Sequence, residues 1–294
     1  MIQIPLLLTA TVNPQGMKGA NFDPKERVEM YVSALEFYAK KGLKVVFAEN
    51  SGYLTTEHTE GTEKDVWGGL MDNPNVEFVD VSDITAEDAE TRRNLAVIRY
   101  DQSRGKGYNE TILLHKAVLK SRFVQEAGCF FKITGRLKVL NVETLLKEVS
   151  SFRFQVSGSR FQVSGFRFLA DCKDHKVYEW LHMPINGHAG ECRYWFASVD
   201  FFETYMWPRY DELNDYEPNI FLAEDLMLDV CRKTRGLAGC RDRFRTQARI
   251  SGKGGHKLGK GWSFFYSTDN DSFALRAKCF IRQCLRWCMP WWRV

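Results

Sequence analysis

The sequence predicts an α/β fold in which a mostly parallel sheet is flanked by helices. Apolar, β-rich segments at residues 2–12, 43–48 and 76–81 alternate with segments of helical spacing. The run at 43–48, LKVVFA, is continuously apolar, as in strands that are buried on both faces. Alternation of strands and helices favours parallel strands joined by crossover helices. The length of 294 residues allows one large domain of this class or two small ones.

The other elements follow from spacing and turn residues. Apolar side chains at helical spacing predict a helix at 27–41, which ends at Gly42, where glycine is favoured. We also expect helices at 85–98, 142–149, 196–206 and 221–234, a strand at 168–174, and a glycine-rich basic loop at 249–260.

The segment 104–136 combines a loop, a helix and a strand. A Gly-Lys-Gly turn opens an amphipathic helix, and a short apolar strand follows and ends in Thr-Gly-Arg. Glycines let an anion approach the backbone, and a helix N-terminus adds a positive dipole end. The turn therefore predicts a phosphate contact through Arg104, Gly105, Lys106 and Gly107, although it lacks the spacing of a Walker motif. A plain solvated turn is the alternative interpretation.

Residues 151–168 interrupt the pattern of strands and helices. FQVSG occurs twice, at 154–158 and 161–165. We interpret 151–168 as an insertion, and a native β-hairpin is the alternative. In neither case do we place chemistry there.

Charge and cysteine spacing exclude several classes of protein. The net charge is +4, and residues 273–294 carry five cations and no acid, so the rest is close to neutral and a nucleic-acid-binding face is not expected. The eight cysteines form no CxxC pair, which predicts reduced thiols in a cytoplasmic protein rather than a zinc site. The N-terminus lacks the features of a signal peptide, and no run of 18 apolar residues predicts a membrane span.

Polar side chains follow the first two predicted strands. Ligands of open α/β sheets bind beyond the carboxyl ends of the strands. Thr11, Asn13, Glu49 and Asn50 lie at such ends, so we expect them to contact a nucleotide. The alternative is that residues 50–52 are only a turn.

Two further groups are candidates for catalysis. Thr134, Gly135 and Arg136 end the strand of the central unit, and an arginine there is suited to point into a cleft; an exposed arginine after a turn is the alternative. Glu224 and Asp225 open a predicted helix, and a carboxylate can deprotonate a sugar hydroxyl. Acids at this position also complement the helix dipole without any catalytic role.

The order of these motifs resembles bacterial GT-A glycosyltransferases of capsule, O-antigen and lipopolysaccharide assembly. The segment VFAENS at 46–51 stands where that group has a VDNxS-like strand end, and GKGYNE at 105–110 stands at its GKG loop. The segment 130–141, FFKITGRLKVLN, and the stretch 195–202 look most like one subgroup. The similarity spans roughly residues 1–265, with 266–294 left as a basic aromatic tail.

One departure concerns the metal. Many GT-A enzymes carry Asp-x-Asp where this chain has Thr134-Gly135-Arg136. The resemblance then implies that Arg136, Lys106 and a late basic segment with Lys253 and His256 neutralise the diphosphate without a metal. Asp171 and Asp174 are the fallback ligands, so Mg²⁺ or Mn²⁺ stays open as a cofactor.

The resemblance implies transfer of a sugar from a nucleotide-sugar donor to a hydroxyl of a glycan or lipid-linked glycan. Glu224 or Asp225 would be the base. A sugar nucleotidyltransferase and a non-catalytic nucleotide- or glycan-binding module are the alternatives.

The C-terminal tail predicts an amphipathic basic helix. Apolar residues from Phe273 to Cys288 recur at helical spacing, cations occupy another face, and tryptophans cluster at the end. Such a helix can lie in an anionic membrane interface, which predicts a peripheral position at the inner face of the cell membrane. A terminal helix docked on the domain is the alternative.

Overall fold

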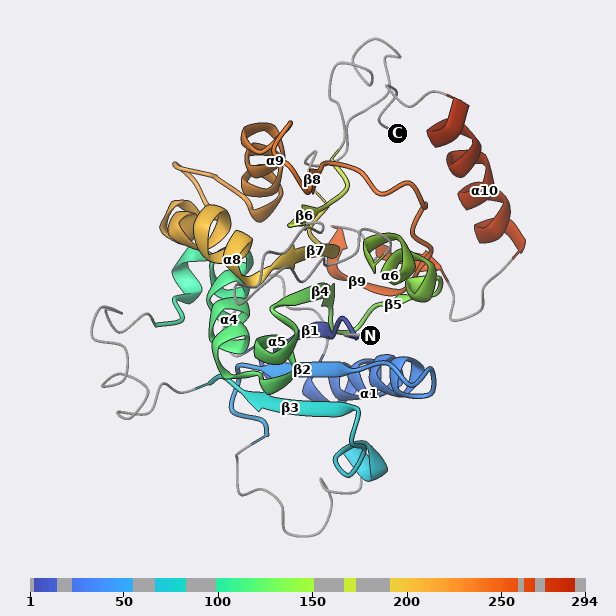
Figure 1. Cartoon of the computed structure of the whole chain (residues 1–294). Helices are drawn as coiled ribbons and strands as arrows, with labels where there is room; N and C mark the ends of the chain where they lie inside the picture. Colours follow the sequence, from blue (N-terminus) through green and yellow to red (C-terminus); the bar gives the residue numbers. More distant parts are fainter. Residues whose placement is uncertain are drawn as a thin grey trace, which may run out of the picture.

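A seven-stranded sheet forms the centre of the molecule, in the order β3-β2-β1-β4-β7-β6-β8 (Figure 1). The computed structural model describes residues 3–14, 23–54, 67–82, 99–150, 167–172, 191–258, 262–267 and 273–288.

Four parallel strands make up one half of this sheet: β1 (Leu6–Ala10), β2 (Val45–Glu49), β3 (Val76–Asp80) and β4 (Cys129–Thr134). β1 lies between β2 and β4, and β3 pairs with β2. In this register Ala10 lies beside Glu49, and Thr9 lies beside Thr134. The polar residues that follow these strands therefore meet at one edge of the sheet.

The other half of the sheet contains β7 (Tyr194–Ser198), β6 (Phe168–Leu169) and β8 (Cys240–Arg241). β7 is antiparallel to both β4 and β6, while β6 and β8 are parallel. A smaller sheet joins β5 (Lys138–Val139), β9 (Ile250–Leu258) and β10 (Trp262–Ser267). The predicted α/β class with a mostly parallel, helix-flanked sheet is confirmed.

Each face of the large sheet has its own apolar core. On one face α1 (Pro24–Ala39) and α6 (Val142–Ser150) pack on side chains such as Leu6, Leu8 and Phe47. On the other, α4 (Lys106–Lys120), α5 (Arg122–Ala127) and α9 (Ala223–Lys233) pack on Leu7, Val46 and Phe130. Alternate side chains of a strand point to opposite faces, which explains why one strand serves both cores.

One element prediction is right only in part, and a second is wrong. The stretch 196–206, expected to be helical, begins inside β7, whose five residues are all buried. Only then do a short helix, α8 (Val199–Phe201), and a π-helical turn (Phe202–Met206) follow, with a 3-10 segment at Trp207–Glu212. Aromatic residues suit a buried strand as well as a helix, and pairing with β4 decides between them.

The glycine-rich segment at 249–260 is the second error, because Ile250–Leu258 form strand β9 instead of a loop. Gly252 has φ 131°, and a Cβ there would approach the side chain of Leu137 to 2.9 Å. The glycine thus permits close strand packing rather than marking a loop.

Other predicted elements are found or lie outside the described residues. The predicted helix at 27–41 corresponds to α1, which starts at Pro24 because Asp23 caps it. The predicted central helix is divided at Ser121 into α4 and α5. Short 3-10 turns occur at Gly68–Leu70 and Gln102–Arg104. The predicted helix at 85–98 lies outside the described residues, as does most of 151–168.

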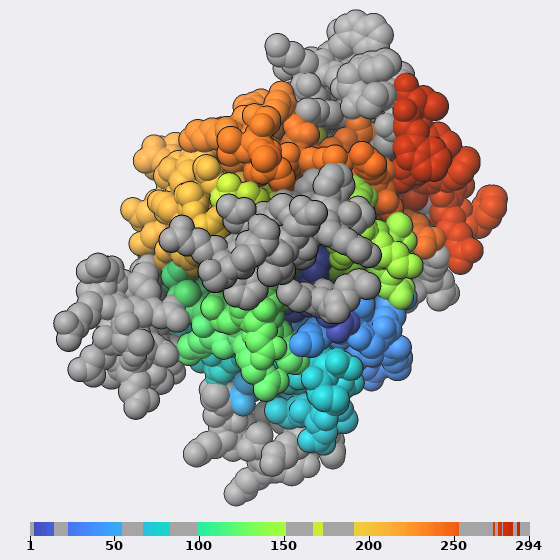
Figure 2. All heavy atoms as spheres, in the orientation of Figure 1, coloured from blue at the N-terminus to red at the C-terminus, as the bar shows by residue number. Residues whose placement is uncertain are grey.

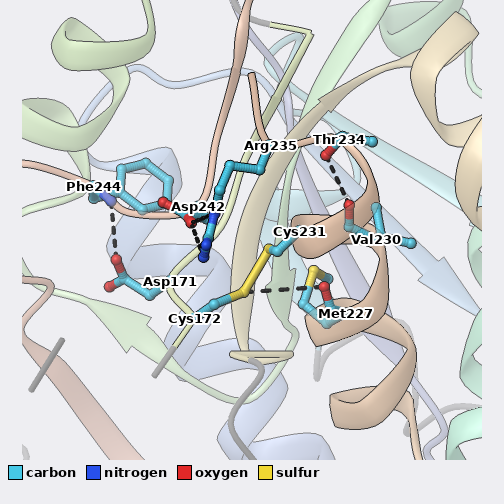
Figure 3. The surroundings of a disulfide bond; sticks show 9 residues. All are labelled: Asp171, Cys172, Met227, Val230, Cys231, Thr234, Arg235, Asp242 and Phe244. Carbon is cyan, nitrogen blue, oxygen red and sulfur yellow. Dashed lines mark hydrogen bonds and ion pairs between the residues drawn. A yellow bond between two sulfur atoms is a disulfide. The ribbon is translucent and has the colours of Figure 1, made fainter. Parts of the chain in front are cut away.

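The prediction that all cysteines are reduced is wrong for one pair. Cys172, which follows β6, and Cys231 of α9 form a disulfide (Figure 3). The two residues are 59 positions apart, so local cysteine spacing could not predict the bond. Only packing of α9 on the sheet brings them together.

Helix α10 (Phe273–Cys288) lies at the outer edge of the molecule (Figures 1 and 2). The side chain of Gln283 holds this helix against the 245–247 segment. Its Oε1 accepts a hydrogen bond from the Gln247 N–H at 2.7 Å, and its Nε2 donates to the Arg245 carbonyl at 2.6 Å. Within the described residues, no helix has the length and apolarity to cross a membrane.

Candidate functional site

The loops after β1 and β2 are joined by side chains that the sequence singled out. The Thr11 hydroxyl donates to Asn50 Oδ1 at 2.7 Å, and the Asn13 N–H donates to Ser51 Oγ at 2.9 Å. We call Thr11, Asn13, Glu49, Asn50 and Ser51 the strand-end network. The structure brings four predicted nucleotide contacts together here, at the carboxyl edge of the sheet.

Glu49 is the centre of the strand-end network, and its side chain is fully buried. Its carboxylate accepts hydrogen bonds from the N–H groups of Val12, Ser51 and Tyr53, at 2.9–3.0 Å, and from the Ser51 hydroxyl. Burial raises the pKa of Glu49, and these hydrogen bonds oppose the rise. Both of its oxygens accept hydrogen bonds from the chain itself, so Glu49 holds the two loops in place.

The Gly-Lys-Gly turn carries an anion supplied by the protein itself. The N–H groups of Lys106 and Gly107, at the start of α4, donate to the carboxylate of Asp215 at 2.6 and 3.4 Å. A carboxylate complements a helix N-terminus in the way that a phosphate would. Asp215 therefore occupies the position where the sequence predicted a phosphate.

Arg104 and Gly105 complete this junction. The Arg104 guanidinium donates to the carbonyls of Asp211 and Leu213, and it forms an ion pair with the Asp211 carboxylate at 3.3 Å. Gly105 has φ 91°, and a Cβ there would lie 2.4 Å from the side chain of Asp215. Both residues thus fasten the 211–215 segment to α4.

A buried ion pair lies beside this turn, on the α4 side of the sheet. Lys132, in the middle of β4, is only 1% exposed, and its ammonium is 2.8 Å from Oε1 of Glu110 in α4. The Thr9 hydroxyl donates to the same oxygen at 2.7 Å. Lys132 also donates to the Thr134 hydroxyl at 3.3 Å and to the Cys192 carbonyl. The lysine is thereby fully partnered.

Further cations converge next to this pair. Burial lowers the pKa of Lys106, and the positive charges of Arg136 and Arg27 lower it further, against the carboxylates of Asp215 and Glu110. We call Arg27, Lys106, Glu110, Lys132 and Arg136 the charged cluster. Its cations come from α1, α4, β4 and the turn after β4. Lys132 lies within β4, whereas Arg27 donates to the carbonyl of Thr11 after β1 and Arg136 follows the end of β4.

Thr134 and Gly135 shape the backbone that presents Arg136. The Gly135 N–H donates to the Thr9 carbonyl at 2.9 Å, and a Cβ on Gly135 would lie 2.5 Å from that oxygen. The Leu137 N–H donates a hydrogen bond to the Thr134 carbonyl at 2.9 Å, which closes a turn. Glycine is needed for this close approach of β4 to β1.

The two acids of α9 have different surroundings. Asp225 caps the helix, since its carboxylate accepts the Leu222 N–H at 3.0 Å. Glu224 lies near Cys192: burial raises the pKa of that thiol well above its usual value, and the charge of Glu224 raises it further. The Cys192 carbonyl accepts a hydrogen bond from Lys132, so Cys192 is near both Glu224 and the charged cluster.

The last predicted residues are located only in part. Lys253 and His256 belong to β9, whose backbone passes the Arg136 carbonyl at Gly252, and their side chains lie outside the described residues. Asp171 accepts a hydrogen bond from the Tyr194 hydroxyl at 2.5 Å. It accepts another from the Phe244 N–H at 2.9 Å (Figure 3).

Of the two fallback metal ligands, Asp171 is described, and Asp174 lies outside the described residues. In the part of the chain that the structure describes, no three His, Cys, Asp or Glu side chains are grouped to hold a metal ion.

Sequence patterns gave little weight to Arg27, Glu110, Lys132 and Asp215. A lysine inside the apolar strand FFKIT was a usable signal, because a buried ammonium requires partners. Asp215 gave no signal, since it follows Lys106 by 109 residues and meets it only in the fold.

Comparison with known proteins adds one distant likeness. No family model matches the chain, and no curated protein matches its sequence. A solved structure described as "a glycosyltransferase involved in the glycosylation of the major capsid of PBCV-1" is similar with a TM-score of 0.31 and 10% identity. The match covers 71% of this chain and 67% of that one. A likeness of this size assigns neither a family nor an activity.

Proposed function

We propose that the protein is a glycosyltransferase that moves a sugar from a nucleotide-sugar donor to a hydroxyl of a surface glycan. The grouping of Arg27, Lys106 and Arg136 beyond the carboxyl ends of β1 and β4 carries this proposal. Arg27 donates to the carbonyl of Thr11, just after β1, at 2.7 Å, Arg136 follows the end of β4, and both charges lower the pKa of Lys106. Ligands of α/β sheets bind at that edge, and grouped cations suit a diphosphate. The base and ribose would lie against Thr11, Asn13 and Asn50, at the neighbouring strand ends.

Side-chain cations, rather than the amides of the Gly-Lys-Gly turn, would neutralise the departing diphosphate. The amides of Lys106 and Gly107 donate to Asp215, whereas the Lys106 side chain belongs to the charged cluster. The charge that many GT-A enzymes supply with a metal would come from Arg136 and its neighbours. Transfer would then continue in the presence of EDTA.

Glu224 would be the general base that accepts the proton of the acceptor hydroxyl. Asp225 is the weaker choice, because its carboxylate caps α9. Glu224→Ala should abolish transfer at a cost in stability of less than about 1 kcal/mol, as expected for an acid lost from the first turn of a helix. Asp225→Ala should cost about 1 kcal/mol of stability, as expected for a lost cap, and should retain measurable turnover. Equal turnover in both variants and the unchanged protein would contradict the assignment.

A lipid-linked acceptor would bring the protein to a membrane, and we propose α10 as the contact. Phe273, Phe280 and Trp287 are spaced seven residues apart on one helix face, and each is at least 65% exposed. Arg276 and Arg282 are also exposed and suit anionic lipid headgroups.

Sedimentation with phosphatidylglycerol vesicles tests this contact. Replacing Phe280 and Ile281 by serine should release the protein from the vesicles. Ile220→Ser, which removes an exposed apolar side chain elsewhere, should leave binding unchanged. Equal binding by all three proteins would rule out α10 as the anchor.

The donor is tested by thermal unfolding with UDP, GDP, ADP, CDP and dTDP in EDTA. A ligand at a hundred times its Kd stabilises the folded state by about 2.7 kcal/mol, so one base should stand out. Arg136→Gln should lose this stabilisation. Arg122→Gln, at a 69% exposed side chain of α5, should keep it.

Other outcomes favour the rivals. A flat response to every diphosphate would contradict the proposal. Nucleotide binding without transfer to any glycan would favour a binding module. Formation of a nucleotide sugar from a sugar phosphate and a nucleoside triphosphate would indicate a nucleotidyltransferase. Stabilisation that appears only with Mn²⁺ would contradict the metal-free form.

A further inference from the structure

Glu110 is held by one oxygen and presents the other. Its Oε1 accepts a hydrogen bond from the Thr9 hydroxyl at 2.7 Å and pairs with the Lys132 ammonium at 2.8 Å. Within the part of the chain that the structure describes, Oε2 accepts no hydrogen bond, and the side chain keeps 31% of its exposure. Two bonds to one oxygen fix the carboxylate, so Oε2 is a preorganised acceptor.

The surroundings determine what kind of group this acceptor can take. Arg136 and Lys106 lie close enough for their charges to couple with Glu110. If these cations hold the diphosphate, the sugar, which is bonded to it, must lie next to them. A sugar presents hydroxyl donors, and a carboxylate is a strong acceptor for them.

We propose that Oε2 of Glu110 accepts a hydrogen bond from a hydroxyl of the donor sugar and helps to select that sugar. This inference rests on the proposed function. It adds a specificity residue that lies one turn inside α4, in the segment for which the sequence indicated only a phosphate contact.

Other roles for Glu110 fit the site less well. Burial raises its pKa, but the charge and hydrogen bond of Lys132, the hydrogen bond of Thr9 and the charge of Arg136 outweigh burial and lower it. A carboxylate with a lowered pKa is a weak base, so proton abstraction is disfavoured. Neighbouring cations also repel a divalent metal.

Glu110→Gln is the sharpest variant. Its carbonyl must stay on Thr9 and Lys132, because both donate, so the amide NH₂ replaces Oε2. An acceptor for the sugar becomes a donor, while the tethered bonds remain. Removing the negative charge also favours the diphosphate. We therefore expect nucleoside diphosphate affinity to stay equal or to rise, and nucleotide-sugar affinity to fall roughly 10- to 100-fold.

Calorimetry without acceptor measures both affinities. The probes are UDP, GDP, ADP and dTDP, each paired with nucleotide sugars that differ in their hydroxyl groups. The sugar that binds the unchanged protein most tightly should show the largest loss in Glu110→Gln. Glu143→Gln, at a half-exposed acid of α6, is the control and should retain the ratio of the two affinities.

Three outcomes overturn the inference. An unchanged ratio of nucleotide-sugar to diphosphate affinity in Glu110→Gln would show that Oε2 does not meet the sugar. An equal loss of affinity for nucleoside diphosphates and for nucleotide sugars would show that Glu110 only keeps the neighbouring cations in position. If the unchanged protein binds neither class, the proposed function fails together with the inference. The first two outcomes leave the proposed function intact.

Discussion

Glu49 and Glu110 are two carboxylates at the same edge of the sheet, and their surroundings are opposite. Glu49 is fully buried, and both its oxygens accept hydrogen bonds from the chain. Glu110 is tethered through one oxygen, couples to the charges of Arg136 and Lys106 besides Lys132, and is 31% exposed. The first stabilises loops, and the second has an oxygen that we propose for a ligand.

The contrast shows how the proposed binding edge would be built. A loop that must hold a ligand needs fixed backbone, which Glu49 supplies by binding three N–H groups. A group that must meet a ligand needs fixed position together with an unused atom, which Glu110 supplies. Residue type and place in the chain do not separate these roles.

The largest effect is expected where the charged cluster loses its buried lysine. Lys132→Met leaves Glu110 without its ion-pair partner, and breaking a buried pair costs 3–5 kcal/mol. We expect a loss of about 3 kcal/mol in the free energy of unfolding, near the low end, because Glu110 keeps 31% exposure. Urea unfolding measures it.

The double variant Lys132→Met with Glu110→Gln is the control for this loss. Removing both charges should recover part of the stability, since no unpaired carboxylate remains. If the two single losses simply add, the pair does not interact in the way the structure indicates.

A smaller effect is expected at the Gly-Lys-Gly turn. Asp215→Asn weakens the acceptor at the N-terminus of α4, and we expect a loss of about 1 kcal/mol of stability. If side-chain cations hold the diphosphate, the affinity of the Asp215→Asn variant for nucleoside diphosphates should change little. A large gain in diphosphate affinity would instead show that the turn amides bind phosphate once Asp215 no longer competes.

The smallest effect concerns pH: the contributions of Glu49 and Glu110 to stability should change with pH in opposite directions. Burial raises the pKa of Glu49 above its usual 4.5, so its contribution to stability is present at low pH and is lost as pH rises through the folded-state value. For Glu110, burial raises the pKa, but Lys132, Thr9 and Arg136 bring it below 4.5. Its contribution is present above 4.5 and is lost as pH falls through the folded-state value.

Glu49→Gln and Glu110→Gln should therefore tilt the pH dependence of stability in opposite directions. Relative to the unchanged protein, Glu49→Gln should lose stability more steeply on acidification, and Glu110→Gln less steeply. Urea midpoints between about pH 3 and pH 7 measure the slopes. Slopes that change in the same direction would contradict the contrast between the two groups.

Local pattern was sufficient for much of the fold. The apolar runs of β1, β2, β3 and β4 and the helical spacing of α1, α6 and α9 placed these elements within a few residues. It failed for β7, where aromatic residues suit either state, and for β9, where glycines looked like a loop. Strand pairing decided the conformation in both places: β7 pairs with the distant β4, and β9 pairs with the neighbouring β10 and with the distant β5.

The sequence by itself determined the α/β class, the parallel order of strands and helices, and the edge at which polar residues meet, because these depend on periodicity and on the ends of strands. Tertiary structure alone decided how those residues act. It placed Asp215 on the turn that had seemed open to phosphate, and it paired Lys132 with Glu110 while leaving one carboxylate oxygen exposed. Charge and hydrogen-bond partners come from segments far apart in the chain, so the role of each polar group is settled only when the chain folds.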